Sequence, residues 1–134
     1  MYSLTLNNQI EEIPSLAAFI EEVCEVAGAS ASVTMNMNLA LEEAVTNVML
    51  YAYPKGEQGT VTITAEVAQG TLTFVITDSG KAFDPTAQAE ADVTLGVEER
   101  PIGGLGIFLV RQLMDRVGYE RKDDCNVLTL VKQL

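Results

Sequence analysis

The chain has 134 residues, and its 19 acidic and 8 basic side chains give a formal net charge of −11 at pH 7. It contains no histidine, which excludes a Ser-His-Asp relay, a histidine-ligated zinc and a phosphohistidine intermediate. Direct binding to nucleic acid needs the opposite charge, whereas a basic protein partner, or a nucleotide that arrives with Mg²⁺, is compatible with it.

Length and hydropathy predict one domain, residues 1–134, with a proper hydrophobic core. No apolar run approaches the roughly 20 residues that cross a bilayer, and no signal-peptide pattern precedes the first segment, so we expect a cytoplasmic protein. Cys24 lies among apolar neighbours in a helical pattern and is expected to be a buried, reduced thiol.

The first part of the chain predicts one strand and two helices. Residues 2–7 alternate between apolar and polar side chains, as a strand does. A first helix is expected from about Pro14 to Gly28. A second, capped by Ser30 or Ser32, is expected to run to Ala52, because an apolar stripe recurs at spacings of three and four residues.

The second part predicts two hairpins separated by a loop and a helix. Residues 60–67 and 71–77 alternate and are rich in β-branched side chains, which favours a hairpin about residues 68–70. Residues 81–100 show little periodicity, as in a functional loop or lid. A helical stripe then extends to Val117, with Gly118 as a plausible C-cap, before a final hairpin of residues 119–122 and 127–132.

This order of elements favours an α/β (α+β) two-layer sandwich, in which a mixed, mostly antiparallel sheet carries helices on one face. A doubly wound parallel sheet would need more alternating strand–helix units.

The first candidate site residues lie in the second helix. Glu43 and Asn47 are four residues apart and therefore share one helix face. A carboxylate can accept a proton from a nucleophile, and an amide oxygen is a ligand that Mg²⁺ accepts beside phosphate oxygens. Taken alone, such a pair is more often an ordinary solvated helix surface, because charged helix faces are common.

The second candidate is Asp78-Ser79-Gly80, which follows the strand 71–77. An acid at a strand end can point into a pocket and accept a hydrogen bond from an exocyclic amine such as that of adenine. Asp-Ser-Gly is also ordinary turn chemistry.

The third candidate is Gly103-Gly104-Leu105-Gly106 at the start of an apolar helix. Glycines allow close approach of a phosphate, and a helix N-terminus offers free N–H groups. The pattern is neither a Walker A loop nor a dinucleotide-binding fingerprint, so alone it is a weak signal.

Together these motifs resemble a known family. EEAVTNVMLYAYP (42–54), ITDSGKAFDP (76–85) and GGLGIFLVRQLMD (103–115) are similar to the three nucleotide-binding boxes of the Bergerat or GHKL ATPase fold of gyrase, large heat-shock chaperones, histidine kinases and MutL. Within that fold, the chain looks most like the single-domain anti-sigma factors with serine kinase activity (the RsbW and SpoIIAB type).

The resemblance implies roles for particular residues. Glu43 would be the general base, Asn47 the Mg²⁺ ligand, and Asp78 the reader of the adenine amine, with Gly80 allowing the base to approach. Residues 83–104 would form the ATP lid. The remaining positions implied to contact the nucleotide are Thr46, Arg100, Gly104, Leu105 and Gly106. Ala82 departs from the family pattern, which commonly has glycine there.

Two functions follow from the resemblance. In the first, the protein uses Mg-ATP to phosphorylate a serine or threonine of a STAS-domain anti-sigma antagonist, and it sequesters a sigma factor, as a homodimer. The alternative is a non-catalytic ATP-binding regulatory module that binds a protein partner. In the kinase reading Glu43 is essential, and in the binding module it is dispensable.

Overall fold

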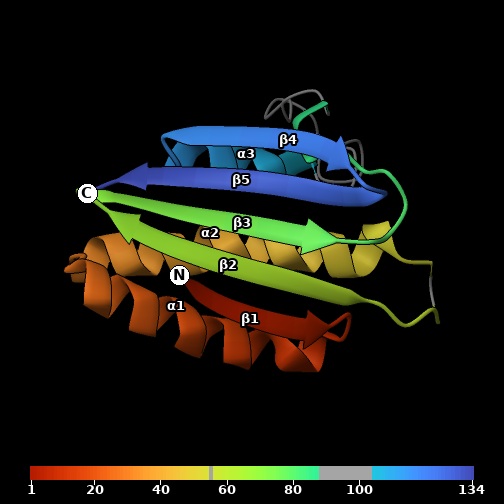
Figure 1. Ribbon diagram of the computed structural model, residues 1–134, viewed down its shortest axis with the longest axis horizontal. Helices are drawn as coiled ribbons and strands as arrows, with labels where there is room; N and C mark the ends of the chain where they lie inside the picture. The colour runs from red at the N-terminus through yellow and green to blue at the C-terminus, as the bar shows by residue number, and fades with distance from the viewer. Residues whose placement is uncertain (55, 88–103) are drawn as a thin grey trace.

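A computed structural model describes residues 1–54, 56–87 and 104–134. Among the described residues, helices cover one face of a five-stranded sheet and leave the other face open (Figure 1). The elements in chain order are β1 Tyr2–Asn7, a 3₁₀ turn Ile10–Glu12, α1 Ile13–Ala27, α2 Ala31–Asn47, a π-helical turn Val48–Ala52, β2 Thr60–Ala68, β3 Thr71–Asp78, a 3₁₀ turn Pro85–Ala87, α3 Gly104–Leu113, β4 Arg116–Lys122 and β5 Cys125–Gln133.

The predicted α+β sandwich is confirmed. The strand order is β1-β2-β3-β5-β4, and all four pairings of the described strands are antiparallel. The β2–β3 hairpin turns at Gln69-Gly70, where both residues have positive φ angles of 51° and 76°. A two-residue turn of this kind matches the right-handed twist of the strands, so register is fixed locally.

The helix ends follow their capping residues. Gly28 ends α1 in the left-handed conformation, with φ 72°, which costs glycine nothing. Ser30, rather than Ser32, caps α2, because its side chain accepts a hydrogen bond from the Val33 N–H at 3.1 Å. The α-helix proper ends at Asn47, and the π-helical turn continues it to Ala52.

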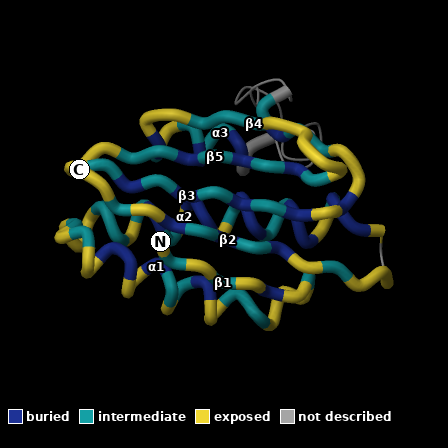
Figure 2. The backbone as a smooth tube through the Cα atoms, in the orientation of Figure 1, coloured by how far each residue is buried: buried dark blue, intermediate teal, exposed yellow. Residues whose placement is uncertain are grey.

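Alternation along the strands places one face in the core (Figure 2). On β3, Leu72, Phe74 and Ile76 are buried against the helices, whereas the residues between them are half-buried on the open face. Full burial of each such large side chain contributes about 1.5–3 kcal/mol. Cys24 is a free, buried thiol as expected, and burial raises its pKa.

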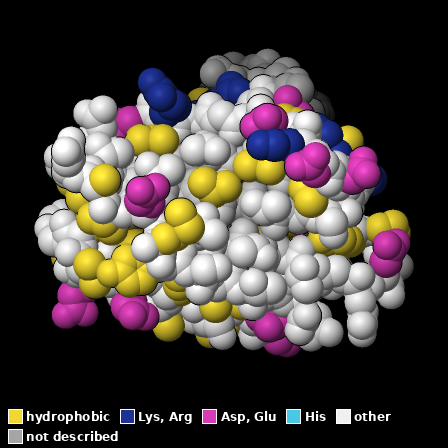
Figure 3. Space-filling view, in the orientation of Figure 1, with side chains coloured by type: hydrophobic (Ala, Val, Ile, Leu, Met, Phe, Trp, Pro, Cys, Tyr) yellow, Lys and Arg dark blue, Asp and Glu magenta, His cyan; other side chains and the backbone are white. Residues whose placement is uncertain are grey.

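The open face of the sheet carries few charges at its centre (Figure 3). The outward residues of β2 and β3 are mostly threonines, with Val75 and Glu66 among them. No helix among the residues that the structure describes is both long and apolar enough to cross a membrane.

The prediction that the last helix reaches Val117 and is capped by Gly118 is wrong. The α3 helix ends at Leu113, and both residues lie inside β4, where Val117 pairs with Leu130 of β5. The chain joins the sheet at Asp115, whose N–H donates to Val131 O at 2.9 Å.

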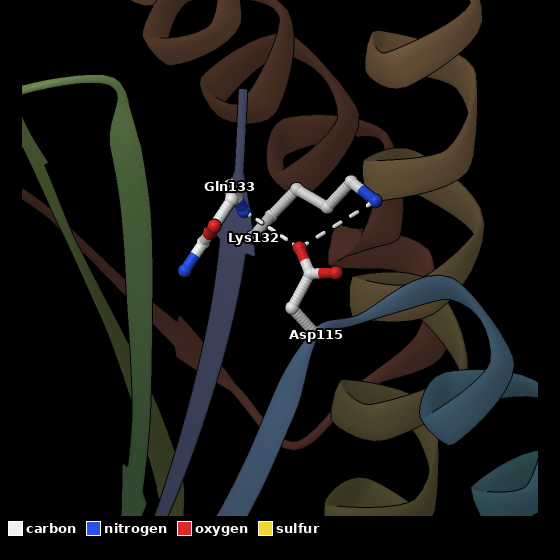
Figure 4. Close-up of polar contacts among 3 residues, drawn as sticks. All are labelled: Asp115, Lys132 and Gln133. Atoms are coloured by element: carbon white, nitrogen blue, oxygen red, sulfur yellow. Dashed lines mark hydrogen bonds and ion pairs between the residues drawn. The ribbon is translucent and has the colours of Figure 1, made fainter.

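The Asp115 side chain fixes this switch from helix to strand (Figure 4). Its Oδ2 accepts the Gln133 N–H at 2.7 Å and lies 3.6 Å from Lys132 Nζ. The final hairpin is consequently longer than expected, and its turn is Asp123-Asp124 alone, with φ angles of 53° and 61°.

Candidate functional site

Asp78 is the buried acid of the candidate site. It is the last residue of β3 and only 3% exposed. Its Oδ1 accepts the Gly80 N–H at 2.9 Å and the Asn126 Nδ2 hydrogen at 2.9 Å. A carboxylate that receives two donors on one oxygen keeps its second oxygen for another partner.

Burial raises the pKa of the Asp78 carboxyl, because desolvation disfavours its charged form. The hydrogen bonds from Asn126 and Gly80 and the positive charge of Arg121 act in the opposite direction. A carboxyl group with a perturbed pKa beside a pocket is typical of functional sites.

Gly80 is packed directly against the end of α2. A Cβ atom at this position would lie 2.3 Å from Ala52 O, so the turn admits only glycine without displacement. The neighbouring Lys81 N–H donates to the same Ala52 O at 2.8 Å. The π-helical turn therefore positions the loop that follows Asp78 relative to α2.

Tyr53, the residue after the π-helical turn, also contacts the loop that follows β3. Its buried hydroxyl donates to Thr60 O and accepts the Ser79 N–H at 3.1 Å. One side chain thus ties the end of the helical segment to the start of β2 and to the loop after β3.

Asn126 of β5 is a site residue that the sequence reasoning missed. It lies directly opposite Asp78 in the β3–β5 register and is 4% exposed. The pairing of β3 with β5 could have indicated Asn126. The predicted final hairpin, with strands 119–122 and 127–132, placed Asn126 in a turn at 123–126 instead of in a strand.

The α2 helix contributes the predicted pair Glu43 and Asn47. Asn47 is half-buried and lines a pocket together with Asp78. Glu43, one turn before Asn47, is also half-buried, and neither it nor Thr46 lines that pocket. The structure thus brings Asn47 and Asp78 to one pocket and leaves Glu43 outside its lining.

The pocket lies between α2, α3, β3 and β5 and is mainly apolar. Its lining consists of Ala44, Asn47, Val48, Ile76, Asp78, Phe83, Pro85, Ile107, Val110, Tyr119, Asn126 and Leu128. Its free space, including the solvent at its mouth, is about 380 Å³, but the part that a water molecule can enter is only about 20 Å³. That is room for about one water, so a flat purine ring can enter only if a wall moves outward.

The glycine-rich motif opens α3. The helix begins at Gly104, and Ile107 and Val110, one and two turns later, line the pocket. The first N–H groups of this helix have no partner within the helix, as at every helix start. Arg100 and the predicted lid segment 88–103 lie outside the described residues. Ala82 is exposed.

These residues fit a nucleotide with its metal ion. Apolar walls with one buried acid suit a flat base that carries an amine. The described residues form no cluster of three metal-ligating acids or cysteines. Mg²⁺ needs no such cluster, because it commonly takes one or two protein oxygens and completes its shell with phosphate oxygens and water. The Asn47 amide can supply such an oxygen.

Comparison with known proteins gives a match over nearly the whole chain. Residues 6–132 match the sequence family described as the histidine kinase-like ATPase domain. The chain is 29% identical over 101 residues to the serine/threonine-protein kinase BtrW of Bordetella bronchiseptica, which is 75% of this chain and 71% of BtrW.

Two further relatives are serine-protein kinases named RsbW. The protein from Halalkalibacterium halodurans is 34% identical over 97 residues, and that from Listeria monocytogenes is 33% identical over 95 residues. These matches cover 69% and 68% of this chain but only 57% and 60% of the two relatives.

Two solved structures share the fold. The histidine kinase domain of the Erythrobacter litoralis EL346 blue-light activated histidine kinase superposes with a TM-score of 0.59 at 16% identity, covering 91% of this chain and 60% of that one. The mycobacterial sensor histidine kinase MprB gives a TM-score of 0.50 at 16% identity, covering 99% of this chain and 100% of that one.

Proposed function

The chain belongs to the histidine kinase-like ATPase family, and on this basis we propose that it is an ATP-dependent serine/threonine-protein kinase of the RsbW type. Its substrate would be a STAS-domain anti-sigma antagonist, and it would also sequester a sigma factor, as a homodimer in the cytoplasm. The observation that carries the proposal is the buried Asp78 carboxylate in an apolar pocket that it shares with Asn47.

In this proposal the pocket residues divide the work. Asp78 accepts a hydrogen bond from the exocyclic amine of adenine. Guanine has a carbonyl at that position and cannot donate this hydrogen bond. The Asn47 amide oxygen would hold Mg²⁺, and the ion would supply positive charge to the phosphates. The N–H groups at the start of α3, from Gly104 to Gly106, would donate hydrogen bonds to phosphate oxygens.

Glu43 is proposed as the general base. Its carboxylate accepts the proton of the substrate hydroxyl as the oxygen of that hydroxyl forms a bond to the γ-phosphorus. The bond from the γ-phosphorus to the bridging oxygen breaks in the same transfer, so ADP leaves and the substrate becomes a phosphomonoester. The partial exposure of Glu43, one helical turn from Asn47, supports this role, because a protein substrate must reach it from solvent.

The charge of residues 1–54 favours a basic protein partner. Residues 1–54 contain no lysine or arginine but have seven glutamates, namely Glu11, Glu12, Glu21, Glu22, Glu25, Glu42 and Glu43. Charge complementarity of this kind accelerates the encounter with a basic protein segment and selects against acidic ones.

The test is capture of partners from the organism's own extract with Mg-ATP, followed by mapping of phosphosites by mass spectrometry. We expect a small STAS-domain protein that carries phosphoserine or phosphothreonine only when wild-type protein and ATP are both present. The matched variant is Glu43→Gln, which should bind ATP normally and transfer phosphate at least ~10²-fold more slowly, the usual contribution of a positioned base.

Other outcomes identify the alternative function. Capture of a sigma factor or another protein without a new phosphosite, and full biological effect of Glu43→Gln, would leave a non-catalytic ATP-binding module. Failure of the wild-type protein to bind ATP would exclude both functions.

A further inference from the structure

Asn126 uses every hydrogen-bonding position of its side chain on the protein itself. Its Nδ2 donates to Asp78 Oδ1 at 2.9 Å and to Lys81 O at 2.8 Å. Its Oδ1 accepts the Phe83 N–H at 3.1 Å and the Tyr119 hydroxyl hydrogen. A primary amide has two donor hydrogens and two acceptor lone pairs, so Asn126 has none left for a ligand.

The same contacts fix the orientation of the amide. Exchanging its oxygen and nitrogen would set an NH₂ group against the Phe83 N–H and an oxygen against Lys81 O and the Asp78 carboxylate. Both arrangements are repulsive, so the network assigns a single orientation. Because the side chain is only 4% exposed, water cannot replace a lost partner without entering the site.

These bonds make the two oxygens of Asp78 unequal. Oδ1 receives both Asn126 and the Gly80 N–H. Within the described residues, Oδ2 receives no hydrogen bond from the protein. Asp78 and Asn126 both line the pocket, so Asn126 holds the carboxylate with its free oxygen available to a bound base.

Asn126 also holds the first residue of the pocket wall. Phe83 and Pro85 line the pocket, and the Phe83 ring lies 6.2 Å from the Tyr51 ring of the π-helical turn. The pocket admits about one water as it stands, so entry of a base requires some lining side chain to move. The hydrogen bond from the Phe83 N–H to Asn126 Oδ1 holds the backbone at the start of this wall.

We propose that Asn126 is a positioning residue for base recognition, which presents the free oxygen of Asp78 to the base amine and anchors the pocket wall at Phe83. The inference rests on the proposed function only in that the base is the adenine of ATP. It adds a residue outside the three sequence motifs, and it assigns Tyr119 as the support of Asn126.

The decisive variant is Asn126→Asp, titrated calorimetrically with Mg-ATP and Mg-GTP against the wild type. It preserves the shape and the acceptor oxygen but replaces the donor to Asp78 with a second carboxylate oxygen. At neutral pH we expect ATP affinity to fall roughly 10- to 100-fold, the range for losing a hydrogen bond to a charged group, and the preference for ATP over GTP to shrink.

The pH dependence separates this role from mere packing. Two adjacent carboxyl groups share one proton, which raises the apparent pKa of the pair. ATP affinity of Asn126→Asp should therefore recover relative to wild type as the pH falls, because a protonated side chain can again donate to Asp78. The other polar groups here are the guanidinium of Arg121, which donates to Gly80 O at 2.9 Å, and the hydroxyl of Tyr119, and both are common to the two proteins.

Two further variants complete the test. Thr129→Val, a change on the same strand whose side chain faces away from the pocket, should leave affinity, selectivity and pH profile unchanged. Tyr119→Phe removes one donor to Asn126 and should weaken ATP binding a few-fold. Wild-type affinity and selectivity in a folded Asn126→Asp protein at neutral pH would overturn the proposal.

A measurement without nucleotide keeps the two proposals distinguishable. Amide hydrogen exchange at Phe83 should be at least ~10-fold faster in Asn126→Ala than in wild type, because its acceptor is gone, while Asn126→Asp retains protection. Absence of ATP binding in the wild type would defeat the proposed function alone. Unchanged exchange at Phe83 in Asn126→Ala would defeat the anchoring role of Asn126.

Discussion

At the scale of single residues, folding favours the neutral form of the Asp78 carboxyl group, whereas the proposed ligand favours the charged form. Burial raises the pKa of its carboxyl group above the ordinary value, so the folded state holds the proton more tightly than the unfolded chain does. The stability that this contributes is complete below the unfolded-state pKa and is lost as the pH rises through the folded-state pKa. At neutral pH the charged carboxylate is therefore a burden on folding.

Asp78→Asn should consequently stabilise the protein while impairing it. The amide oxygen can still accept from Gly80 and Asn126, and no charge is buried. We expect a higher Tm than wild type at pH 7, with the gap narrowing as the pH falls into the carboxyl range. ATP affinity should fall roughly 10- to 100-fold, because an amide NH₂ then faces the adenine amine.

Thermal unfolding between pH 3.5 and 7.5 and nucleotide titration check this prediction. Glu66→Gln, on the open sheet face, is the charge-matched control and should show neither effect. A Tm below that of wild type at pH 7, or full ATP affinity and selectivity in Asp78→Asn, would contradict the assignment of Asp78.

Gly80 offers a second residue-scale prediction. An added methyl would lie 2.3 Å from the backbone oxygen of Ala52, so Gly80→Ala must displace the loop and should cost about 1–3 kcal/mol of unfolding free energy. Gly118→Ala is the matched control, since its Cβ meets nothing within 4 Å in strand β4. It should be neutral or stabilise by up to about 1 kcal/mol. Urea denaturation distinguishes the two, and equal midpoints would refute the close approach.

At the scale of elements, the sequence predicted correctly those helix ends and turns that depend on interactions between residues close in sequence. The α1 helix, the start of α2 and the β2–β3 hairpin follow from capping residues, apolar periodicity and a short turn. The α3–β4 boundary could not be predicted this way. Ile107, Val110 and Met114 are buried, and Val117 is partly buried against the same core. The apolar residues therefore keep a helical spacing up to Val117, although Val117 lies in a strand. The helix ends where Asp115 pairs with Val131 of β5, a contact outside the helix itself.

The candidate site divides in the same way. Asp78, Gly80 and Asn47 were predicted because their motifs are contiguous in sequence, and the structure places Asp78 and Asn47 at one pocket. Asn126 was missed because its meaning depends on register with β3, 48 residues earlier. The roles of all the predicted site residues remain predictions: Glu43, Thr46, Asn47, Asp78, Gly80, Arg100, Gly104, Leu105 and Gly106.

The N-cap of α2 gives the element-scale prediction. Ser30 accepts the Val33 N–H at 3.1 Å, so Ser30→Ala should lower the unfolding free energy by about 1 kcal/mol. Ser32→Ala is the control, because Ser32 is exposed in the first helical turn and does not cap it. Chemical denaturation should separate the two variants, and a larger loss in Ser32→Ala would show that the cap is misassigned.

At the scale of the whole molecule, charge is unevenly distributed along the chain. All eight lysines and arginines follow residue 54, whereas the seven glutamates before it lie without a basic neighbour in sequence. On α1, Glu21, Glu22 and Glu25 are exposed. The helical layer is therefore the acidic side on which a basic sigma-factor segment would be steered, in contrast to the nearly uncharged centre of the open sheet face (Figure 3).

Reversing charge on α1 should slow partner association without affecting the nucleotide. For Glu21→Lys with Glu25→Lys, we expect the association rate with the captured sigma factor to fall about 10-fold or more at low salt, and the difference to fade above roughly 0.5 M salt as screening shortens the Debye length. ATP affinity should not change, because neither residue lines the pocket. Surface plasmon resonance across a salt series measures the rates, with Glu66→Lys on the open sheet face as control. Slowing by Glu66→Lys alone would move the docking surface to the sheet, and equal rates for all three proteins would mean that the acidic helices do not steer the partner.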